Sequence, residues 1–150
     1  MEFRDAVEGD LYAVVGLLAD DILGAERERH ADPLPDEYLE AFARMKAYGG
    51  NRLIVAVDEA GAIKGCLQLT ITPGLARRGA IRATIEGVRV AASERGAGLG
   101  AALLNFAIEE ARRANCALVQ LTTDKARPDA ARFYERLGFE ASHVGMKLRL

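Results

Sequence analysis

The stretch from 81 to 111 constrains the fold most, because it reads as a strand, a glycine-rich loop and a helix in direct succession. Apolar and β-branched residues run through 81–90, and Gly96, Gly98 and Gly100 then stand at alternate positions. One apolar stripe recurs at helical spacing beyond the strand: Leu99, Leu103, Leu104, Ala107, Ile108 and Ala111. A strand that passes straight into an amphipathic helix predicts a chain of the α/β class.

The apolar face of the strand slips by one residue near Glu86 and Gly87. Apolar residues occupy odd positions before the slip and even positions after it: Ile81, Ala83 and Ile85, then Val88 and Val90. Because side chains alternate strictly along a strand, keeping both sets on one face requires an extra residue, a β-bulge. Gly87 is a natural occupant, and the bulge would re-aim Glu86. A strand buried on both faces, or a plain strand end, gives the same pattern and stays open.

The glycine loop predicts an anion site. The unpaired N–H groups and the positive dipole end of the following helix meet there, and residues without side chains allow close approach. A phosphate or pyrophosphate is the natural occupant, with Arg95 adding positive charge. A tight strand-to-helix turn also selects glycine. The loop matches neither the P-loop, since no Lys-Ser/Thr pair follows, nor the dinucleotide fingerprint, since its glycines are each two apart.

Four further elements are expected ahead of this unit. A short strand is predicted for 2–7, and helical spacing of apolar residues predicts a first helix within 9–23, behind Asp10 as a possible cap. A second helix is predicted over 36–48 by the same spacing. Two β-rich runs around a glycine-containing turn predict a hairpin within 52–71.

Three elements are expected behind it. The run 117–123 is β-rich, and 128–139 has helical spacing with Gly138 as its C-terminal stop. The final residues, 139–150, are expected to form a broken strand pair.

Composition limits the class of protein. With 150 residues, half of them hydrophobic, the chain suits one globular domain, and a net charge of -2 argues against a nucleic-acid partner. Cys66 and Cys116 make neither a metal spacing nor a disulfide framework, so we expect free thiols in a reducing cytoplasm. His30 and His143 have no ligand-spaced partners, so no metal is expected. We also expect neither a leader nor a membrane span.

Two motifs together resemble one family. The run Arg95-Gly96-Ala97-Gly98-Leu99-Gly100 after "IEGVRV", followed further on by "ARFYERLGFE", is closely similar to the GNAT superfamily of acyl-CoA-dependent N-acetyltransferases. The similarity covers essentially the whole chain. It implies a single α/β domain over 1–150 with a mixed, mainly antiparallel sheet and helices on both faces. The bulged Glu86 strand would splay away from the Leu118 strand, so that the sheet is split between these two strands.

The resemblance implies acetyl-CoA as cosubstrate. In the family, the backbone of the glycine loop holds the pyrophosphate, which here corresponds to the residues from Arg95 to Gly100. The bulged strand offers free backbone to the pantetheine arm, and this puts Val88 and Val90 beside it. Members often carry an asparagine at the position of Arg127, which here either meets a CoA phosphate or is a solvated loop charge.

Amine acetylation needs three chemical roles. A base must take the proton of the amine before the nitrogen attacks, and Glu86, directly or through water, is the candidate. The thioester oxygen needs a fixed donor, which by resemblance is the Val88 N–H. The departing thiolate needs a proton, and Tyr134 stands where the family often keeps a tyrosine for this purpose. By spacing alone Tyr134 would be a core residue.

These inferences predict an enzyme that moves an acetyl group from acetyl-CoA to a primary amine by direct attack in a ternary complex. No covalent intermediate is expected, because neither cysteine lies in the predicted site. The alternative is a non-catalytic acyl-CoA-binding regulatory module of the same fold. A small-molecule or peptide amine fits as the acceptor, since the loops 19–35 and 72–80 that surround its site vary in the family. Four acidic residues flank the acceptor loop and either indicate a cationic amine or are merely solvated: Asp20, Asp21, Asp36 and Glu37. A homodimer is common in the family.

Overall fold

The computed structural model describes residues 1–21 and 23–150; Ile22, inside the first predicted helix and the 19–35 loop, lies outside the described residues. One sheet of five strands forms its centre, in the order β1-β2-β3-β4-β5. The strands are β1 (Glu2–Asp5), β2 (Asn51–Val57), β3 (Ile63–Thr72), β4 (Ile81–Val90) and β5 (Cys116–Leu121). Neighbours pair antiparallel except β4 and β5, which are parallel. The mixed, mainly antiparallel sheet is therefore confirmed.

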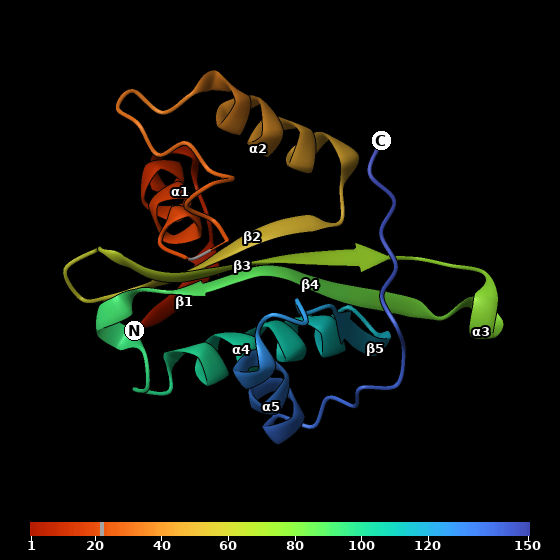
Figure 1. Ribbon diagram of the computed structural model, residues 1–150. Helices are drawn as coiled ribbons and strands as arrows, with labels where there is room; N and C mark the ends of the chain where they lie inside the picture. Colours follow the sequence, from red (N-terminus) through yellow and green to blue (C-terminus); the bar gives the residue numbers. More distant parts are fainter. Residues whose placement is uncertain (22) are drawn as a thin grey trace.

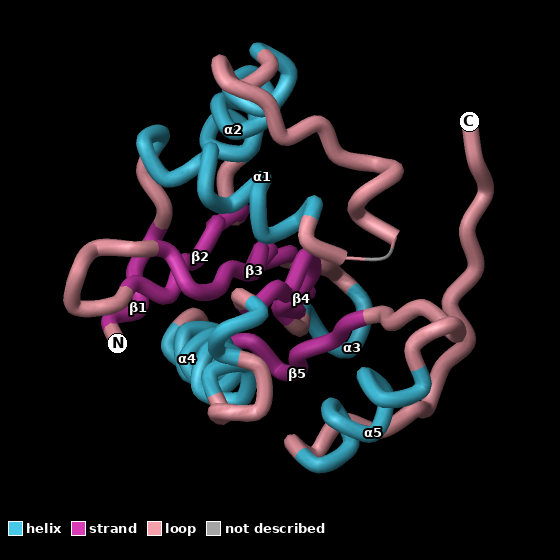
Figure 2. The backbone as a smooth tube through the Cα atoms, turned by 60° about the vertical axis from the view of Figure 1, so that its left-hand side comes forward, coloured by secondary structure: helices cyan, strands magenta, loops and turns pink. Residues whose placement is uncertain are grey.

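Helices cover both faces of this sheet (Figures 1 and 2). On one face lie α1 (Leu11–Ala19) and α2 (Asp36–Tyr48), and on the other lie α4 (Leu99–Arg113) and α5 (Pro128–Arg136). Short elements complete the chain: the 3-10 turns η1 (Glu8–Asp10) and η2 (Ala92–Glu94), and the single turn α3 (Ala76–Gly79). The three-layer arrangement is the one that the sequence predicts.

Strand alternation divides the core into two clusters. On one face, Ile54 of β2 and Leu67 of β3 form a cluster with Leu103 of α4, and all three are fully buried. Val55, the neighbour of Ile54 in β2, faces the other way and packs with Phe42 of α2. Buried apolar contacts on both faces hold the sheet rigid, so it can serve as a fixed frame for a site at its edge.

Asp10 does not cap α1, contrary to the sequence-based expectation. Its carboxylate accepts a hydrogen bond from the Val7 N–H (2.8 Å) and pairs with the guanidinium of Arg4 in β1 (2.6 Å). No side chain caps α1, which continues directly from η1. The sequence pattern predicts a cap, but the Asp10 carboxylate pairs with Arg4 instead of accepting a hydrogen bond from the first turn of α1.

The strand pair expected over 139–150 is wrong. This segment contains no strand in the described structure; it runs alone past the end of β5 (Figure 1), and every residue in 140–150 is exposed. His143, expected in strand packing, is also exposed and lies against the Ser142 hydroxyl. Apolar residues do alternate here, but within the described residues the segment pairs with no strand, so no ladder forms.

Candidate active site

The central strand changes its pairing at the predicted bulge. Gln68 of β3 stands opposite Glu86, but Cys66 stands opposite Arg89, so two residues of β4 face only Leu67. Gly87 occupies the bulge with φ 61°, a conformation that favours glycine. Pairing of β4 with the parallel β5 ends at Ile85 and Leu121. From Glu86 onward the two strands part, which confirms the predicted split of the sheet.

The glycine loop lies at the open end of this parting. Gly98 is the N-cap of α4 with φ 86°, and Gly96 has φ 82°; open space surrounds the Cβ direction of both. Leu99 is buried in the core, so it presents backbone alone. The N–H groups of the first helical turn have no intrahelical partner, whereas the Ala97 N–H already donates to Glu94. The loop therefore retains the form of an anion cradle.

Close packing joins the cradle to β4 and α5. A Cβ on Gly100 would lie 3.4 Å from the Phe133 ring and 3.6 Å from a Val90 methyl group. Val88 and Val90 are half-buried against the core on the α4 side. The structure thus brings three parts into one region: the glycine loop, the helix that carries Tyr134, and the open half of β4, by which we mean residues 86–90, which lack β5 as a partner.

Glu86 and Tyr134 approach this region from different layers. Glu86 is exposed on the α1–α2 face, beside Gln68. Tyr134 comes from α5, is partly buried, and contacts the rings of Phe133 and Phe139. Burial raises the pKa of the Tyr134 hydroxyl above its ordinary value, while the positive charges of Arg89 and Arg127 act against that rise. A hydroxyl that stays protonated can donate a proton.

A cluster of charges bridges the parting of the strands. Asp21, which follows α1, accepts from Arg89 of β4 (3.3 Å) and from Arg127, the N-cap of α5. Burial works to raise the pKa of the Asp21 carboxyl, but the Arg127 hydrogen bond and the two positive charges outweigh it and hold this pKa low. Asp20 in turn pairs with Arg95 at 3.1 Å. These two carboxylates are thus engaged by arginines, against the hint that they await a cationic amine.

Sequence reasoning missed a row of polar side chains that crosses four strands. Each member of the row stands opposite the next one in the neighbouring strand, in the order Asn51, Thr70, Thr84 and Gln120. Thr70 donates to Asn51 (3.1 Å) and Gln120 to Thr84 (3.2 Å). The row lies next to Glu86 on the same sheet face. Alternation of polar and apolar residues in β3 was the available signal, but the register that aligns the strands was not.

Cys66 lies closer to the site than the sequence suggested. Its thiol is buried and donates to the Gly87 carbonyl at the bulge (3.8 Å). Burial raises the pKa of this thiol to about 12, so it is not a nucleophile near neutral pH. Cys116 is half-buried, and burial raises its thiol pKa as well. Among the described residues, no cluster of His, Cys, Asp and Glu could hold a metal ion.

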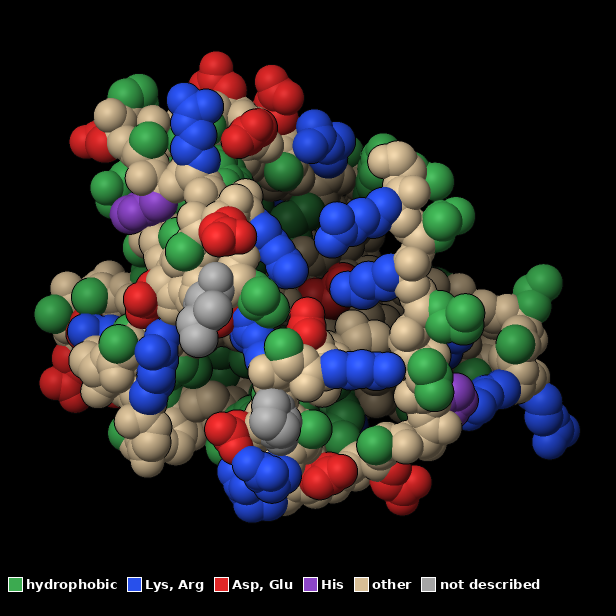
Figure 3. Space-filling model, in the orientation of Figure 1, with side chains coloured by type: hydrophobic (Ala, Val, Ile, Leu, Met, Phe, Trp, Pro, Cys, Tyr) green, Lys and Arg blue, Asp and Glu red, His purple; other side chains and the backbone are tan. Residues whose placement is uncertain are grey.

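The surface over this region is concave. Figure 3 shows a hollow between the two helical layers, beside the C-terminal segment, with Lys and Arg side chains gathered around it. Lys147 and Arg149 of that segment are exposed. Within the described residues, no helix has the length and apolar character needed to span a bilayer.

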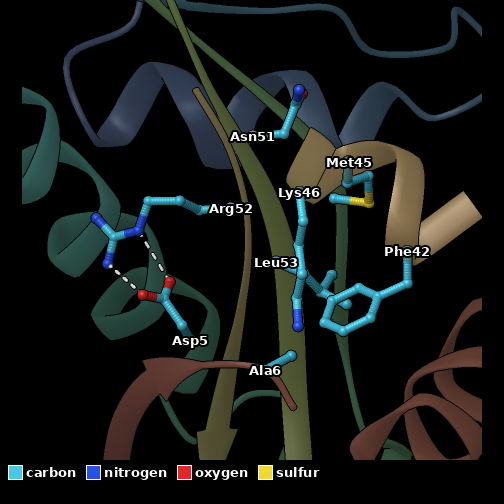
Figure 4. A pocket seen from close by; sticks show the side chains of 8 residues that line it. All are labelled: Asp5, Ala6, Phe42, Met45, Lys46, Asn51, Arg52 and Leu53. Carbon is cyan, nitrogen blue, oxygen red and sulfur yellow. Dashed lines mark hydrogen bonds and ion pairs between the residues drawn. The ribbon is translucent and has the colours of Figure 1, made fainter. Parts of the chain in front are cut away.

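A separate cavity of about 190 Å³ lies between the end of α2 and the edge formed by β1 and β2. Arg52 turns toward Asp5 on one side, and Phe42 with Lys46 closes the other (Figure 4). Both Asp5 (2.8 Å) and Glu110 (2.5 Å) pair with Arg52. None of the predicted site residues lines this cavity, so we do not assign the chemistry to it.

Comparison with known proteins supplies independent evidence. The sequence profile described as "Acetyltransferase (GNAT) family" matches residues 19–139. A glucosamine 6-phosphate N-acetyltransferase of Trypanosoma brucei brucei is 36% identical over 152 residues, covering 100% of this chain and 96% of that protein. An aminoalkylphosphonate N-acetyltransferase of Salmonella typhimurium is 49% identical over 49 residues, covering 33% and 32% of the two chains.

A solved structure is also very similar. It is described as a transcriptional regulator from Bacillus halodurans C-125, shares 52% identity, covers 99% of both chains and has a TM-score of 0.95. The GNAT-like fold of the chain is thereby established, together with the class of chemistry that its sequence profile carries.

Proposed function

Because the chain belongs to the GNAT acetyltransferase family and is an acetyl-CoA-dependent N-acetyltransferase, we propose that it acetylates a primary amine by direct attack in a ternary complex. The observation that carries this proposal is the parting of β4 and β5 at the Gly87 bulge, with the glycine loop at its open end. These features support one binding site for the donor, with Glu86 and Tyr134 as the candidates for proton removal and proton donation.

The donor would be held mainly by backbone. The N–H groups of Gly98, Leu99 and Gly100 at the start of α4 suit a pyrophosphate, and Gly96 and Ala97 shape the loop ahead of them. Arg95 and Arg127 add positive charge, although each is paired with an aspartate in the free protein. The backbone of Val88 and Val90, freed from β5, suits the amide groups of the pantetheine arm.

The proposed reaction forms a C–N bond to the amine and breaks the C–S bond of the thioester. Glu86, directly or through water, accepts a proton from the amine, whose nitrogen forms the new C–N bond. The Val88 N–H stabilises the charge on the thioester oxygen. As the C–S bond breaks, sulfur takes its electron pair and Tyr134 donates the proton that converts it to a thiol, and the second proton that the nitrogen loses after its attack restores the Tyr134 phenol. Cys66, buried and with a pKa of about 12, is unsuited to a covalent intermediate.

We infer that the acceptor is a primary amine that also carries a phosphate or phosphonate. Basic side chains surround the hollow over the site, and the polar row from Asn51 to Gln120 offers hydrogen bonds to a hydroxylated molecule. The names of two relatives, one acting on glucosamine 6-phosphate and one on aminoalkylphosphonates, support the same class of acceptor.

A second candidate function is a regulatory module that binds acyl-CoA without turnover. The observation in its favour is the description of the 52% identical protein as a transcriptional regulator. The two candidates make the same prediction for donor binding and opposite ones for thiol release. The net charge of -2 gives no support to direct binding of nucleic acid.

We also propose a homodimer. Val144, Met146, Leu148 and Leu150 alternate along the C-terminal segment and are exposed. In the described structure β5 is an edge strand, so a second copy would offer an open edge to this segment. Light scattering should report a dimer for the full chain and a monomer after truncation behind His143. A cytoplasmic location would agree with the two free thiols.

The first experiment is a calorimetric titration with acetyl-CoA, run beside CoA, ATP and NAD. We expect both CoA species to bind, and Gly98→Val to abolish binding because φ 86° disfavours a β-branched residue. Preference for ATP or NAD would overturn the assignment of the loop.

Thiol release should then be measured with amine acceptors. Glucosamine 6-phosphate and 2-aminoethylphosphonate should exceed their matched controls, glucosamine and ethylamine. Equal rates within each pair would remove the proposed anionic group. Initial-rate plots should intersect, as for a ternary complex, and parallel lines would instead indicate a covalent intermediate.

A further inference from the structure

Two arginines from opposite sides of the parting meet on one carboxylate. Arg89 projects from the open half of β4, and Arg127 precedes α5 beyond the end of β5. Both donate to the same oxygen, Oδ2 of Asp21. All three side chains are at most one-third exposed, with exposed fractions of 23%, 31% and 18%. Pairs shielded to this extent are screened by solvent less than surface pairs.

The cluster is not electrically neutral. Two guanidinium groups and one carboxylate leave a net charge of +1 over the gap. Arg89 Nη1 also donates to the Val88 carbonyl (2.8 Å), and among the described residues the buried Arg89 Nε has no hydrogen-bond partner. An extra positive charge held in place by backbone and carboxylate contacts suits a site where negative charge develops.

This charge lies within electrostatic reach of Tyr134. Arg127 is the N-cap of α5, the helix that carries Tyr134, and the positive charges of Arg89 and Arg127 both act to lower the pKa of the Tyr134 hydroxyl. Tyr134 packs against the same core cluster as Val88 and Val90, the two neighbours of Arg89 in β4. One arginine therefore lies directly before the tyrosine's helix, and the other lies in β4 between two valines that pack against the same core cluster as the tyrosine.

We propose that Asp21, Arg89 and Arg127 are positioning residues for acetyl transfer, which together hold one net positive charge beside Tyr134 and the departing sulfur. This inference rests on the proposed proton donation by Tyr134. When the C–S bond breaks, negative charge forms on sulfur and passes to the phenolate oxygen as the proton moves. The two arginines favour both charged states, and Asp21 holds them together while cancelling one charge.

The charged surroundings of Tyr134 define the test. Within the described residues, Arg89 comes from β4 and Arg127 from the segment before α5, and Asp21 acts through its bonds to both. Cys66 of β3 is neutral at working pH, because burial raises its thiol pKa to about 12. The α4 side chains in this core cluster are apolar, and the other ionisable residues of α5 are exposed.

Tyrosinate absorbance reports the pKa of Tyr134 without any ligand. The chain has no tryptophan and four tyrosines, so subtracting the titration of the matching Tyr134→Phe protein isolates one residue. Arg89→Gln removes a cation and should raise the pKa of Tyr134 by about one unit. Asp21→Asn removes the anion and should lower it. Arg89→Lys keeps the charge and should leave it near the wild-type value.

Opposite shifts in the first two variants are the decisive result. Arg136→Gln, which removes an exposed arginine from the same helix, should change nothing. Shifts of the same sign, or no shift beyond this control, would overturn the inference. Should Arg89→Gln fail to fold by circular dichroism, Arg127→Gln carries the same expectation.

Kinetics separates this inference from the function on which it rests. Arg89→Gln should lower kcat and move the basic limb of the kcat profile to higher pH, whereas Asp21→Asn should move that limb to lower pH. If Tyr134→Phe leaves kcat unchanged, the proton-donor role fails whatever the shifts. If it lowers kcat but the absorbance shifts are absent, the charge cluster alone is refuted.

Discussion

The two halves of β4 differ although they form one continuous strand. From Ile81 to Ile85 the strand pairs with β3 on one side and β5 on the other, and Ala83 and Ile85 are 0% and 1% exposed. From Glu86 onward it pairs with β3 alone, and its side chains are exposed or half-buried. We call these the paired half and the open half.

The difference teaches how a rigid sheet can offer free backbone. Every ladder bond and buried methyl group in the paired half stabilises the fold. The open half gives up one set of ladder partners, and its N–H and C=O groups become available to a ligand. Gly87 at the bulge lies between the two halves, so the position of this glycine in the sequence sets where the fully paired part of the strand ends.

Deletion of Gly87 should have the largest effect, because it would remove the bulge that stands between the two halves. Without the extra residue, β4 regains strict alternation and can continue its regular pairing with β3. We expect a folded protein with no measurable acetyl transfer, since the backbone around Glu86 and Val88 would lose the geometry that the bulge imposes on it. Gly87→Ala is the matched control: it keeps the register, costs about 1–2 kcal/mol in backbone strain, and should retain turnover per folded molecule.

Tyr134→Phe should leave both halves of β4 intact and remove the hydroxyl that we propose as the proton donor. We expect kcat to fall by about 10²–10⁴-fold with donor affinity nearly unchanged. Thiol release and calorimetry measure the two quantities. Tyr48→Phe, at a tyrosine that is 82% exposed, should have no effect. An unchanged kcat would remove Tyr134 from the mechanism.

Ile85→Ala should sharpen the comparison from the paired half. Removing a fully buried side chain should cost about 2–5 kcal/mol of the free energy of unfolding, measured in urea, with kcat of the folded protein largely retained. Val88→Ala in the open half should cost less stability, because Val88 is only half-buried. Equal losses at the two positions would contradict the division of β4.

Local patterns predicted the parts of the fold that local physics determines. The helix from Asp36 to Tyr48, the β2–β3 hairpin and the bulge at Gly87 all follow from spacing within a few residues of each other. The 139–150 segment shows the limit. Alternation indicates that a segment is suited to a strand, but a strand also needs a partner edge, and the sequence does not say whether one lies nearby.

The site was predictable only in part, for a related reason. The glycine loop is contiguous, so its form could be inferred, and its approach to Tyr134 followed from the family resemblance. Asp21 contacts Arg89, which is 68 positions away in the sequence, and Arg127, which is 106 positions away. The polar row depends on the register of four strands. The roles of Glu86 and Tyr134 stay predictions until the variants are measured.

The smallest effect should distinguish two ion pairs by pH. Asp21 pairs with Arg89 in the open half of β4, and Asp10 pairs with Arg4 of β1, the edge strand at the far end of the sheet; interactions with arginine hold the carboxyl pKa of both below its ordinary value. A lowered folded-state pKa adds stability that is complete above the unfolded pKa of about 3.9 and disappears as the pH falls through the folded value.

Each Asn variant should therefore lose about 1 kcal/mol or less relative to wild type at neutral pH, and this difference should vanish in acid. Urea unfolding as a function of pH measures the loss. Only Asp21→Asn should also change the pH profile of acetyl transfer, because only Asp21 lies over the gap. The same change in Asp10→Asn would mean that the pH profile responds to the loss of any ion pair in the fold rather than to the charges over the gap.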